Sequence, residues 1–593
     1  MRKTLYILLF FTATMGFAQN DLLAKNYFEQ GQYAKALTIY EKLTAQFPHR
    51  LDFFLAKVET NQQLENFIEA EKLLIDKINS SRNYPQLYVE LGHNFQLQNN
   101  QIQADENYQL AISAIDPNPN FAYTIGGAFE KYSLLDRAIV VYEKAMLLND
   151  KLNFSMQLAN IYGEQGNLEK MFDSYLALIL KNQGYKGAIQ RYFSLYITED
   201  PLNEANVILR KALLQYSQES QDLLYNQLLS WLFVQQKDFK KAFTQEKAIF
   251  KRTDEGLSGI TNLAYIAIAE EDYTNSRTIV DFIIENAYTQ GARLQAYQLL
   301  MKIELKTASP KQYPEIEGQF QKLLTEYKNA SQTYLLQIDY NHFLAFQYNK
   351  KEIAIANLKE LSKESLNPYQ EARVKMELAD ILVFNEKFNE ALIYYSQIQK
   401  KVQSDILAQE ARFKVARTSY FKGDFQWAQV QLDVLKKSTS QLIANDAMQL
   451  SLIIQDNSLE DSTQTALKKY ARADLLEFQD KNQESIAVLD DILTNNKGEK
   501  IEDEALFKQG QLFEKIGQFE KAETNYLKII EFYKEDILVD DAHYYLAKLY
   551  ETKLNLPDKA KQEYEQIIFN HSDSIYFVES RKKFRSLRGD AIN

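Results

Sequence analysis

Small and hydrophobic residues recur at fixed intervals along this chain. With Ala36 as an origin, Ala24 lies twelve residues before it, Tyr27 nine before, Tyr40 four after and Leu43 seven after. Offsets of three and four residues place side chains on one face of a helix. Small residues at the origin and twelve before it let two helix backbones approach closely. The pattern therefore predicts a hairpin of two helices packed through this face.

The same pattern repeats through the chain. The next four origins follow at separations of 34, 34, 34 and 33 residues: Ala70, Ala104, Ala138 and Met171. Further origins, more loosely spaced, are Ala205, Ala242, Ser276, Ala354, Ala391, Ala428, Ser485, Ala522 and Ala560, with a weaker match at Gly318. The 57-residue gap between Ala428 and Ser485 is expected to hold an additional helix, at "LIANDAMQLSLII".

Residues 510–529, "GQLFEKIGQFEKAETNYLKI", show the pattern most fully, and this unit resembles the tetratricopeptide repeat. The resemblance covers most of the chain. It implies an all-α fold, a right-handed superhelical α-solenoid in which each helical hairpin completes its core against its neighbours. Four glycines are expected at the turns inside their hairpins, where a positive φ costs glycine little: Gly31, Gly166, Gly423 and Gly517.

The spacing of the origins and the composition of the two ends predict the domain organisation. We expect a cleaved signal peptide over 1–18, an N-terminal tetratricopeptide array over 19–290, an irregular region of similar hairpins over 291–480, C-terminal units over 481–570, and a capping helix with a basic tail over 571–593.

The first residues are typical of a secretory signal. Arg2 and Lys3 precede an apolar run from Leu5 to Phe11, and Ala18 is a small residue at the expected cleavage point. An uncleaved membrane anchor is the alternative, although the run is shorter than the ~20 residues that span a bilayer. We expect an exported protein that resides in the periplasm, with association with the outer membrane or secretion as alternatives, and with no integral membrane segment in the mature chain.

Composition and charge exclude several kinds of partner. The chain has no cysteine, which excludes disulfides, thiolate metal sites and a lipid anchor on cysteine. Its net charge of −12 falls to −14 when the two cations of the signal are removed, so we expect no nucleic-acid or anionic-lipid partner. One basic stretch near the end is either a solvated helix face or a docking patch: Arg581, Lys582, Lys583, Arg585 and Arg588.

Catalytic motifs are missing from the sequence. It contains no GxxxxGK[ST] or GxGxxG loop, no GxSxG elbow and no HExxH helix. The five histidines lie 28 or more residues apart, so none pairs with another on one helix turn as zinc ligands do: His49, His93, His342, His543 and His571. We expect no cofactor, no metal and no enzymatic activity. An enzyme whose site is invisible in the sequence remains an alternative.

The resemblance implies a concave groove lined by the first helix of each hairpin, suited to an extended peptide or a partner's helix. The register assigns the following residues to this groove: Val89, His93, Gln96, Tyr123, Glu130, Met156, Asn160, Met376, Asp380, Phe413, Arg417, Tyr420, Phe507, Gln511 and Glu514. The protein is therefore expected to be a scaffold that binds one or more other proteins.

The last units resemble tetratricopeptide proteins of the bacterial envelope, in "DDAHYYLAKLYE" and "NHSDSIYFVES". The usual proline is replaced by His571 and Ser572, and the lipidated cysteine of the outer-membrane assembly protein is missing. This resemblance supports an envelope location and contact with an outer-membrane or envelope complex. A permanent subunit of such a complex is the second interpretation.

Overall fold

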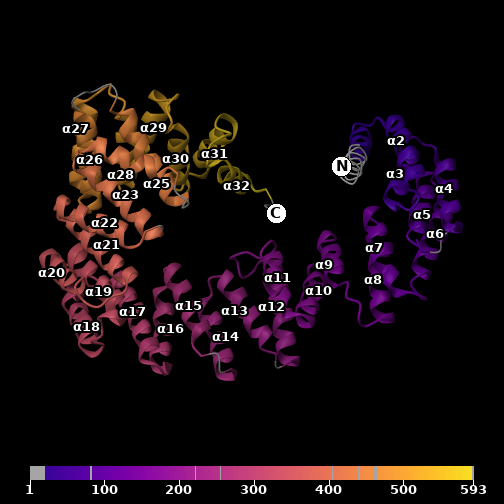
Figure 1. Ribbon diagram of the computed structural model, residues 1–593, viewed down its shortest axis with the longest axis horizontal. Helices are drawn as coiled ribbons and strands as arrows, with labels where there is room; N and C mark the ends of the chain where they lie inside the picture. The colour runs from indigo at the N-terminus through magenta and orange to yellow at the C-terminus, as the bar shows by residue number, and fades with distance from the viewer. Residues whose placement is uncertain are drawn as a thin grey trace, which may run out of the picture. The chain divides into compact units, whose positions relative to one another are not determined.

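The computed structural model describes residues 20–80, 83–220, 222–253, 256–403, 405–437, 441–458 and 464–590, and in this part of the chain the regular elements are all helical. The predicted signal peptide, 1–18, lies outside the described residues. The fold is an all-α helical-repeat solenoid, and Figure 1 shows its helices stacked as successive antiparallel pairs within each part of the chain.

The chain divides into two compact units, with the division between Gln236 and Lys237. Unit 1 begins with a helical segment at 20–29. Its other helices are α2 (Tyr33–Gln46), α3 (Leu51–Gln63), α4 (Phe67–Ser80), α5 (Leu87–Leu97), α6 (Gln101–Ser113), α7 (Ala122–Lys131), α8 (Leu135–Leu148), α9 (Ser155–Glu164), α10 (Leu168–Lys181), α11 (Lys186–Phe193), α12 (Glu204–Glu219) and α13 (Leu223–Gln235).

Unit 2 contains the remaining helices. These are α14 (Phe239–Arg252), α15 (Ser258–Ala269), α16 (Tyr273–Asn286), α17 (Gln290–Thr307), α18 (Tyr313–Glu326), α19 (Ala330–His342), α20 (Lys351–Leu361), α21 (Pro368–Phe384), α22 (Phe388–Lys401), α23 (Ile406–Phe421), α24 (Phe425–Leu435), α25 (Gln441–Asp456), α26 (Thr465–Phe478), α27 (Asn482–Asn495), α28 (Glu502–Lys515), α29 (Phe519–Phe532), α30 (Val539–Thr552), α31 (Pro557–Asn570) and α32 (Phe577–Arg588). Because α16 packs on α17, the compact unit continues across the predicted boundary at 290.

Each hairpin has a first helix and a second helix, and the second helix contains the origin. Except for Gly318, all the proposed origins are buried. At the crossing of the two helices, the ring four residues after the origin lies against the small residue twelve before it. A Cβ on Gly92 would lie 2.4 Å from the ring of Tyr108, and one on Gly510 would lie 2.8 Å from the ring of Tyr526. The residue twelve before these origins is small because the tyrosine ring occupies its side-chain space.

Most hairpin turns contain one residue with positive φ, five positions before the origin. The four predicted glycines are confirmed there, with φ of 72° at Gly31 and Gly166, 81° at Gly423 and 76° at Gly517. Other hairpins place a non-glycine residue at this position, with φ between 53° and 60°: Glu65, Asn99, Ser133, Lys237, Glu271, Asn349, Glu386, Asp480 and Asn555. This conformation costs a non-glycine residue about 1–2 kcal/mol, so helix packing imposes the turn on these residues.

Two irregular stretches of the repeat pattern can be compared with the prediction. The origin proposed at Gly318 is wrong, and the additional helix proposed between Ala428 and Ser485 is confirmed. Gly318 is exposed and is not an origin. The origin of that hairpin is the buried Ile316, followed at the usual offsets by the buried Phe320 and Leu323. The pattern of small residues did not identify Ile316 as an origin, because this residue is large and branched. The additional helix after Ala428 is present as α25, which packs on α24 and α23.

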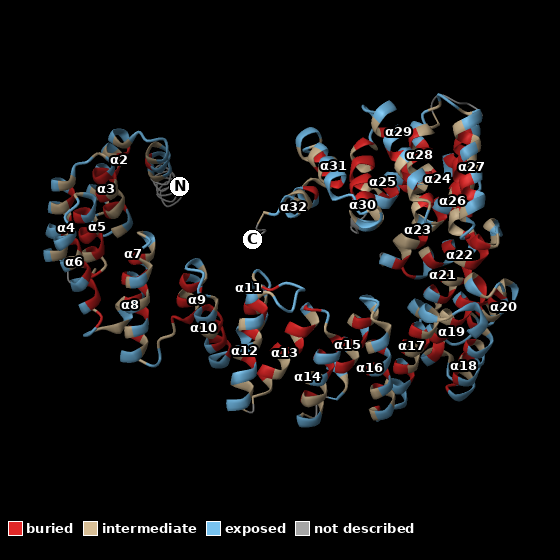
Figure 2. Cartoon of the chain, turned by 180° about the vertical axis from the view of Figure 1, so that it is seen from behind, coloured by how far each residue is buried: buried red, intermediate tan, exposed pale blue. Residues whose placement is uncertain are grey.

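Stacking joins the hairpins into continuous cores. In unit 2 one cluster of buried hydrophobic residues extends from Leu294 to Ile567. Figure 2 shows buried positions where helices face one another and exposed positions along their outer sides. A single hairpin therefore completes its apolar core only against its neighbours.

The chain's C-terminal segment forms α32, which packs on α31. Phe584 and Leu587 are partly buried against the core of unit 2, while Arg581 and Lys582 are exposed. Lys583 forms an ion pair with Glu551 at 2.8 Å, and Arg585 lies 3.6 Å from Asp590. Part of the basic stretch is thus bound by carboxylates of the chain itself, which the sequence did not predict.

Candidate functional site

The predicted groove residues lie on the first helices, at positions fifteen, eleven and eight residues before the origin. Three of them are buried, since Val89 is 0% exposed, Met376 7% and Tyr420 1%. Neighbouring first helices cover these positions, because α5 contacts α7, α21 contacts α23, and α23 contacts α26. Val89, Met376 and Tyr420 therefore cannot line an accessible groove, and the prediction is wrong for these three residues.

Five polar residues of the predicted groove accept a hydrogen bond from a tyrosine on the second helix of their own hairpin. The pairs are Tyr108 to Gln96 at 2.7 Å, Tyr175 to Asn160 at 2.9 Å, Tyr395 to Asp380 at 2.5 Å, Tyr526 to Glu514 at 2.6 Å, and Tyr142 to Glu130. Burial raises the pKa of Tyr108 and Tyr175 to about 12, so each hydroxyl stays protonated and donates. These bonds fix the orientation of the acceptors and leave further lone pairs open to a partner.

A cluster of polar residues links three consecutive first helices of unit 1, α3, α5 and α7. The hydroxyl of Tyr132 donates to Glu90, which is only 3% exposed. Lys131 Nζ lies 3.6 Å from Glu90 and 3.3 Å from Glu59. The ring of His93 stacks on Tyr132 with centroids 3.7 Å apart. Of these residues, only His93 was predicted from the sequence as a site residue. The sequence does not show which residue of another helix a charged side chain will pair with.

The stacked His93 is expected to make unit 1 sensitive to acid. Burial, with the nearby Lys131, lowers the pKa of His93 to about 4 in the folded chain, against about 6.5 when unfolded. A group with a depressed folded pKa contributes stability that is present above pH ~6.5 and is lost as the pH falls toward ~4. His93→Phe keeps the stacking and cannot be protonated. Urea denaturation at about pH 7 and about pH 4.5 should therefore show a smaller loss of stability in this variant.

His49→Phe, at an exposed position, is the matched control and should keep the pH dependence of the parent chain. Burial raises the pKa of Glu90, which acts in the opposite sense and makes that carboxyl more stabilising as the pH falls. The comparison between variants removes this contribution, since Glu90 is common to all of them. An equal loss of stability in His93→Phe and the parent would contradict the prediction.

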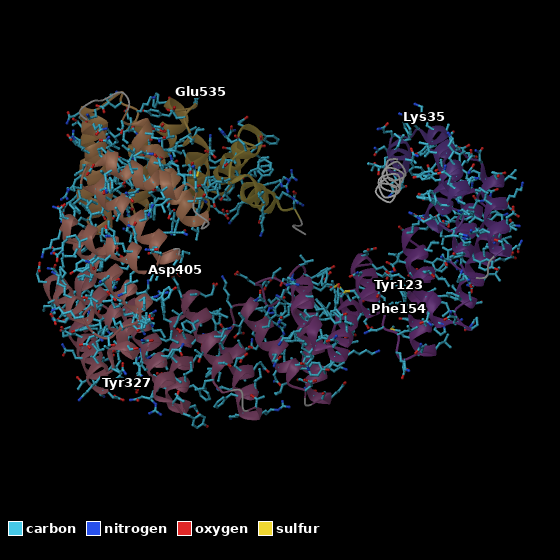
Figure 3. The ribbon with its side chains drawn as sticks, viewed as in Figure 1. Lys35, Tyr123, Phe154, Tyr327, Asp405 and Glu535 are labelled. Carbon is cyan, nitrogen blue, oxygen red and sulfur yellow. The ribbon has the colours of Figure 1, made fainter. Side chains whose placement is uncertain are left out.

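Three of the predicted groove residues of unit 1 are exposed, and together with the half-buried Met156 we call them the Tyr123 face: Gln96, Tyr123, Met156 and Asn160. Tyr123 is 67% exposed on α7, Gln96 on α5 and Asn160 on α9 are exposed, and Met156 is half-buried. Figure 3 labels Tyr123 together with Phe154, which is buried just before α9 and stacks on Tyr142 at 4.8 Å. The Tyr123 face thus combines an exposed ring with two oriented amide side chains.

In unit 2 an aromatic cluster joins the ends of four first helices. Its rings are Phe346, in the π-helical turn Phe343–Gln347 that follows α19, and Phe384, Phe421 and Phe478, at the ends of α21, α23 and α26. Phe346 and Phe384 have centroids 4.4 Å apart, and Phe478 lies 6.1 Å from each of them. The guanidinium of Arg417, another predicted groove residue, lies over Phe421 and Phe478. Phe384 and Phe421 are buried, and Phe346 and Phe478 are half-buried.

Ion pairs connect the first helices of unit 2 from one hairpin to the next. They are Lys302 with Asp339 at 3.9 Å, His342 with Glu377 at 2.9 Å, Lys414 with Asp380 at 2.5 Å, and Lys508 with Asp474 at 3.2 Å. Asp380, predicted to bind a partner, therefore already has a cation and a tyrosine beside it.

The remaining predicted groove residues of unit 2 are partly buried and contact neighbouring helices. Phe413, Phe507 and Gln511 are half-buried. The ring of Phe507 meets that of Tyr545 edge-on, with centroids 5.3 Å apart. These positions hold adjacent hairpins together and offer little free surface.

The arrangement of the described residues bears on metal binding and on membrane insertion. No group of three or more His, Asp or Glu in the described ranges is placed to hold a metal ion. Burial and the adjacent Asp503 raise the pKa of Glu504, on α28, to about 9. None of the helices described here is both long and apolar enough to cross a membrane.

Comparisons with known proteins agree with the hairpin register. Residues 22–49 and 504–536 match the family described as tetratricopeptide repeat. The first match spans the hairpin of Ala36, and the second spans the hairpin of Ala522. The chain therefore contains tetratricopeptide repeats. No curated protein matches the chain.

Two solved structures match the chain over nearly its whole length. A chain of Naa15/Naa10 bound to HypK-THB is 11% identical, with 97% of each chain covered and a TM-score of 0.32. A chain of the APC/C hetero-tetramer Cut9–Hcn1 is 13% identical, with 96% of each chain covered and a TM-score of 0.25. Likenesses at these TM-scores say nothing about what this chain binds.

Proposed function

We propose that this protein is a non-catalytic scaffold that binds another protein along the first helices of unit 1. The observation that carries the proposal is the exposure of Tyr123, a large ring left 67% open to solvent on a first helix. Aromatic side chains of this kind are enriched among residues that dominate binding energy at protein interfaces. The tetratricopeptide repeats support the same function, since stacked hairpins present extended binding surfaces.

The chemistry of the Tyr123 face favours an extended peptide or one face of a partner's helix. Tyr123 supplies apolar contact area, and the half-buried Met156 adds to it. Tyr108 and Tyr175 orient Gln96 and Asn160, whose amides both donate and accept. Amide groups match the main chain of an extended peptide as well as polar side chains of a helix.

We further propose that the protein works in the bacterial envelope after export. The supporting features are the cations and the apolar run at the start of the sequence, the absence of cysteine from the chain, and the resemblance of the last units to envelope tetratricopeptide proteins. The partner is then an envelope protein, held reversibly in a scaffold or permanently in an assembly complex.

Site-specific photo-crosslinking in the native envelope tests the proposal. A photoreactive phenylalanine at position 123 is expected to give one discrete adduct. The same residue at Leu147, which is 88% exposed on the second helix α8, should give none. Gln96→Ala combined with Asn160→Ala should lower the yield at position 123, because both amides belong to the same surface.

Equal adducts at positions 123 and 147, or none at position 123, would refute the use of this face. The stoichiometry of the recovered complex separates the two kinds of partner, since a permanent subunit copurifies at a fixed ratio. In the recovered complex, the mass of this chain should correspond to a sequence that starts at Gln19. A mass that includes residues 1–18 would contradict cleavage of the signal peptide.

A further inference from the structure

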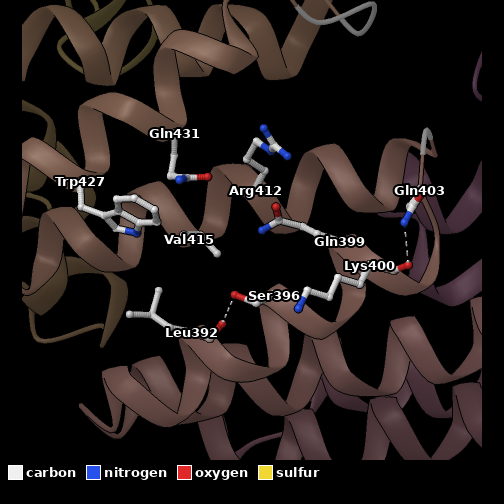
Figure 4. A pocket seen from close by; sticks show the side chains of 9 residues that line it. All are labelled: Leu392, Ser396, Gln399, Lys400, Gln403, Arg412, Val415, Trp427 and Gln431. Carbon is white, nitrogen blue, oxygen red and sulfur yellow. Dashed lines mark hydrogen bonds between the residues drawn. The ribbon is translucent and has the colours of Figure 1, made fainter.

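A hollow lies among α22, α23 and α24 of unit 2, and none of its lining residues belongs to the Tyr123 face. Its volume is about 550 Å³, within the range of pockets that hold small ligands or a few residues of a peptide. Figure 4 shows one wall from α22, with Leu392, Ser396 and Gln399, and the opposite wall from α24, with Trp427 and Gln431. Arg412 and Val415 of α23 lie between them.

The two ends of the hollow differ in chemistry. Trp427 and Leu392 lie at one end, and the indole is 48% exposed although it is one of only two tryptophans in the chain. Lys400 and Gln403 lie at the other end, with Arg412 nearer the middle. An apolar group fits the first end, and a polar, negatively charged group fits the second.

The charge of the hollow is unbalanced. The described residues that line it include two cations, Arg412 and Lys400, and no Asp or Glu, although the chain as a whole has a net charge of −12. Arg412 is half-buried as a residue, and its guanidinium has no hydrogen bond or ion pair with any residue that the structure describes. An arginine withdrawn from water without an acceptor is costly, and a carboxylate is the group that best satisfies its donors.

From these observations we propose that the hollow binds a short acidic peptide segment of a partner protein. A large apolar side chain of the segment packs on Trp427 and Leu392. Carboxylates of the segment, from Asp, Glu or a chain end, pair with Arg412 and with Lys400. Gln399 and Gln431 face the segment with amides that pair with peptide N–H and C=O groups.

A neutral sugar is the main rival occupant, since an exposed indole also stacks on sugar rings. A neutral sugar would leave Arg412 and Lys400 without a counter-charge. The charge of the hollow therefore favours the acidic peptide. The site lies on the second-helix side of its hairpins and does not depend on the Tyr123 face, so failure of either proposal leaves the other intact.

Fluorescence titration of the full chain carrying Trp231→Phe tests the proposal, because Trp427 is then the sole tryptophan. The probes are a set of synthetic nonapeptides with one Phe or Leu and two Asp or Glu at varied spacing. Their twins carry Lys in place of the acids, and chitotriose represents a sugar. We expect at least one acidic peptide to shift the emission of Trp427, to bind at least about ten-fold more tightly than its lysine twin, and to weaken with salt.

Substitutions in the hollow and matched controls complete the test. Arg412→Gln should weaken the best peptide about ten-fold or more, whereas Lys363→Gln, at an exposed cation of the same unit, should not. In a chain that keeps both tryptophans, Trp427→Ala should remove binding measured by peptide anisotropy. Ile353→Ala, at a half-exposed apolar residue of α20, should leave it unchanged. If circular dichroism shows that Arg412→Gln is misfolded, Lys400→Gln replaces it.

Three outcomes would overturn the proposal. The first is a set in which no acidic peptide binds more tightly than its lysine twin. The second is an unchanged affinity in the folded Arg412→Gln or Lys400→Gln chain. The third is an emission shift with chitotriose and none with the peptides, which would identify the hollow as a sugar site.

Discussion

Replacing Gly126 by alanine is expected to destabilise unit 1 by about 1–3 kcal/mol through overpacking. Its new Cβ would lie 2.3 Å from Cζ of Tyr142 and 2.6 Å from the phenol oxygen. That ring is 1% exposed and its hydroxyl donates to Glu130, so it has no free space to move into. Chemical denaturation of the full chain should show the loss as an earlier transition of unit 1.

The adjacent Gly127 is a matched control on the same helix. A Cβ there would meet no atom within 4 Å, and the position is exposed. Gly127→Ala should stabilise unit 1 by about 0.5–1 kcal/mol, because alanine loses less backbone entropy than glycine in a helix. In a Tyr142→Ala background the penalty of Gly126→Ala should disappear. Equal effects of the two alanines, or a penalty that survives removal of the ring, would contradict the overpacking explanation.

Phe478→Ala is expected to destabilise unit 2 by about 2–4 kcal/mol, since it removes a half-buried ring from the aromatic cluster. The loss includes contacts with Phe346, Phe384 and Phe421, and with the guanidinium of Arg417. Because these partners belong to three other hairpins, hydrogen exchange should rise in α19, α21 and α23 as well as in α26.

Phe532→Ala on α29 is the control, since that ring is 68% exposed and should contribute less than about 0.5 kcal/mol. An effect of Phe478→Ala no larger than that of the control would show that the cluster adds nothing to stability. Faster exchange confined to α26 and α27 would show that it does not couple the hairpins.

The contrast between Gly126 and Phe478 separates what can be predicted from the sequence from what cannot. Gly126, Ala138 and Tyr142 belong to one hairpin and lie within sixteen residues of each other. Contacts inside a hairpin repeat in every unit, so their spacing appears in the sequence as a period. For this reason the origins, the tyrosine four residues after them and the glycine turns could be predicted, with Ile316 missed because its branched side chain hides the pattern.

The candidate binding surface could be predicted only as a set of positions. Val89, Tyr123, Met156 and Met376 all lie fifteen residues before an origin, yet Tyr123 is 67% exposed while Val89 is 0% and Met376 7% exposed. Whether one of these positions is buried depends on how the neighbouring hairpin packs against it. The sequence of a single hairpin does not contain that information. The tyrosine bonds to Gln96 and Asn160 were missed because a polar groove residue and a hydrogen-bonded packing residue look alike in a sequence.

The sequence by itself determined the helical class, the hairpin register and most of the small-residue crossings, because these depend on contacts between residues close along the chain. Tertiary structure alone decided the aromatic cluster, the ion pairs between first helices, the left-handed turn residues such as Glu65 and Asp480, and the hollow beside Trp427. Each of these joins residues from different hairpins or is imposed by their packing. The angle at which one hairpin stacks on the next sets those contacts, and it arises from many small contacts that no single motif encodes.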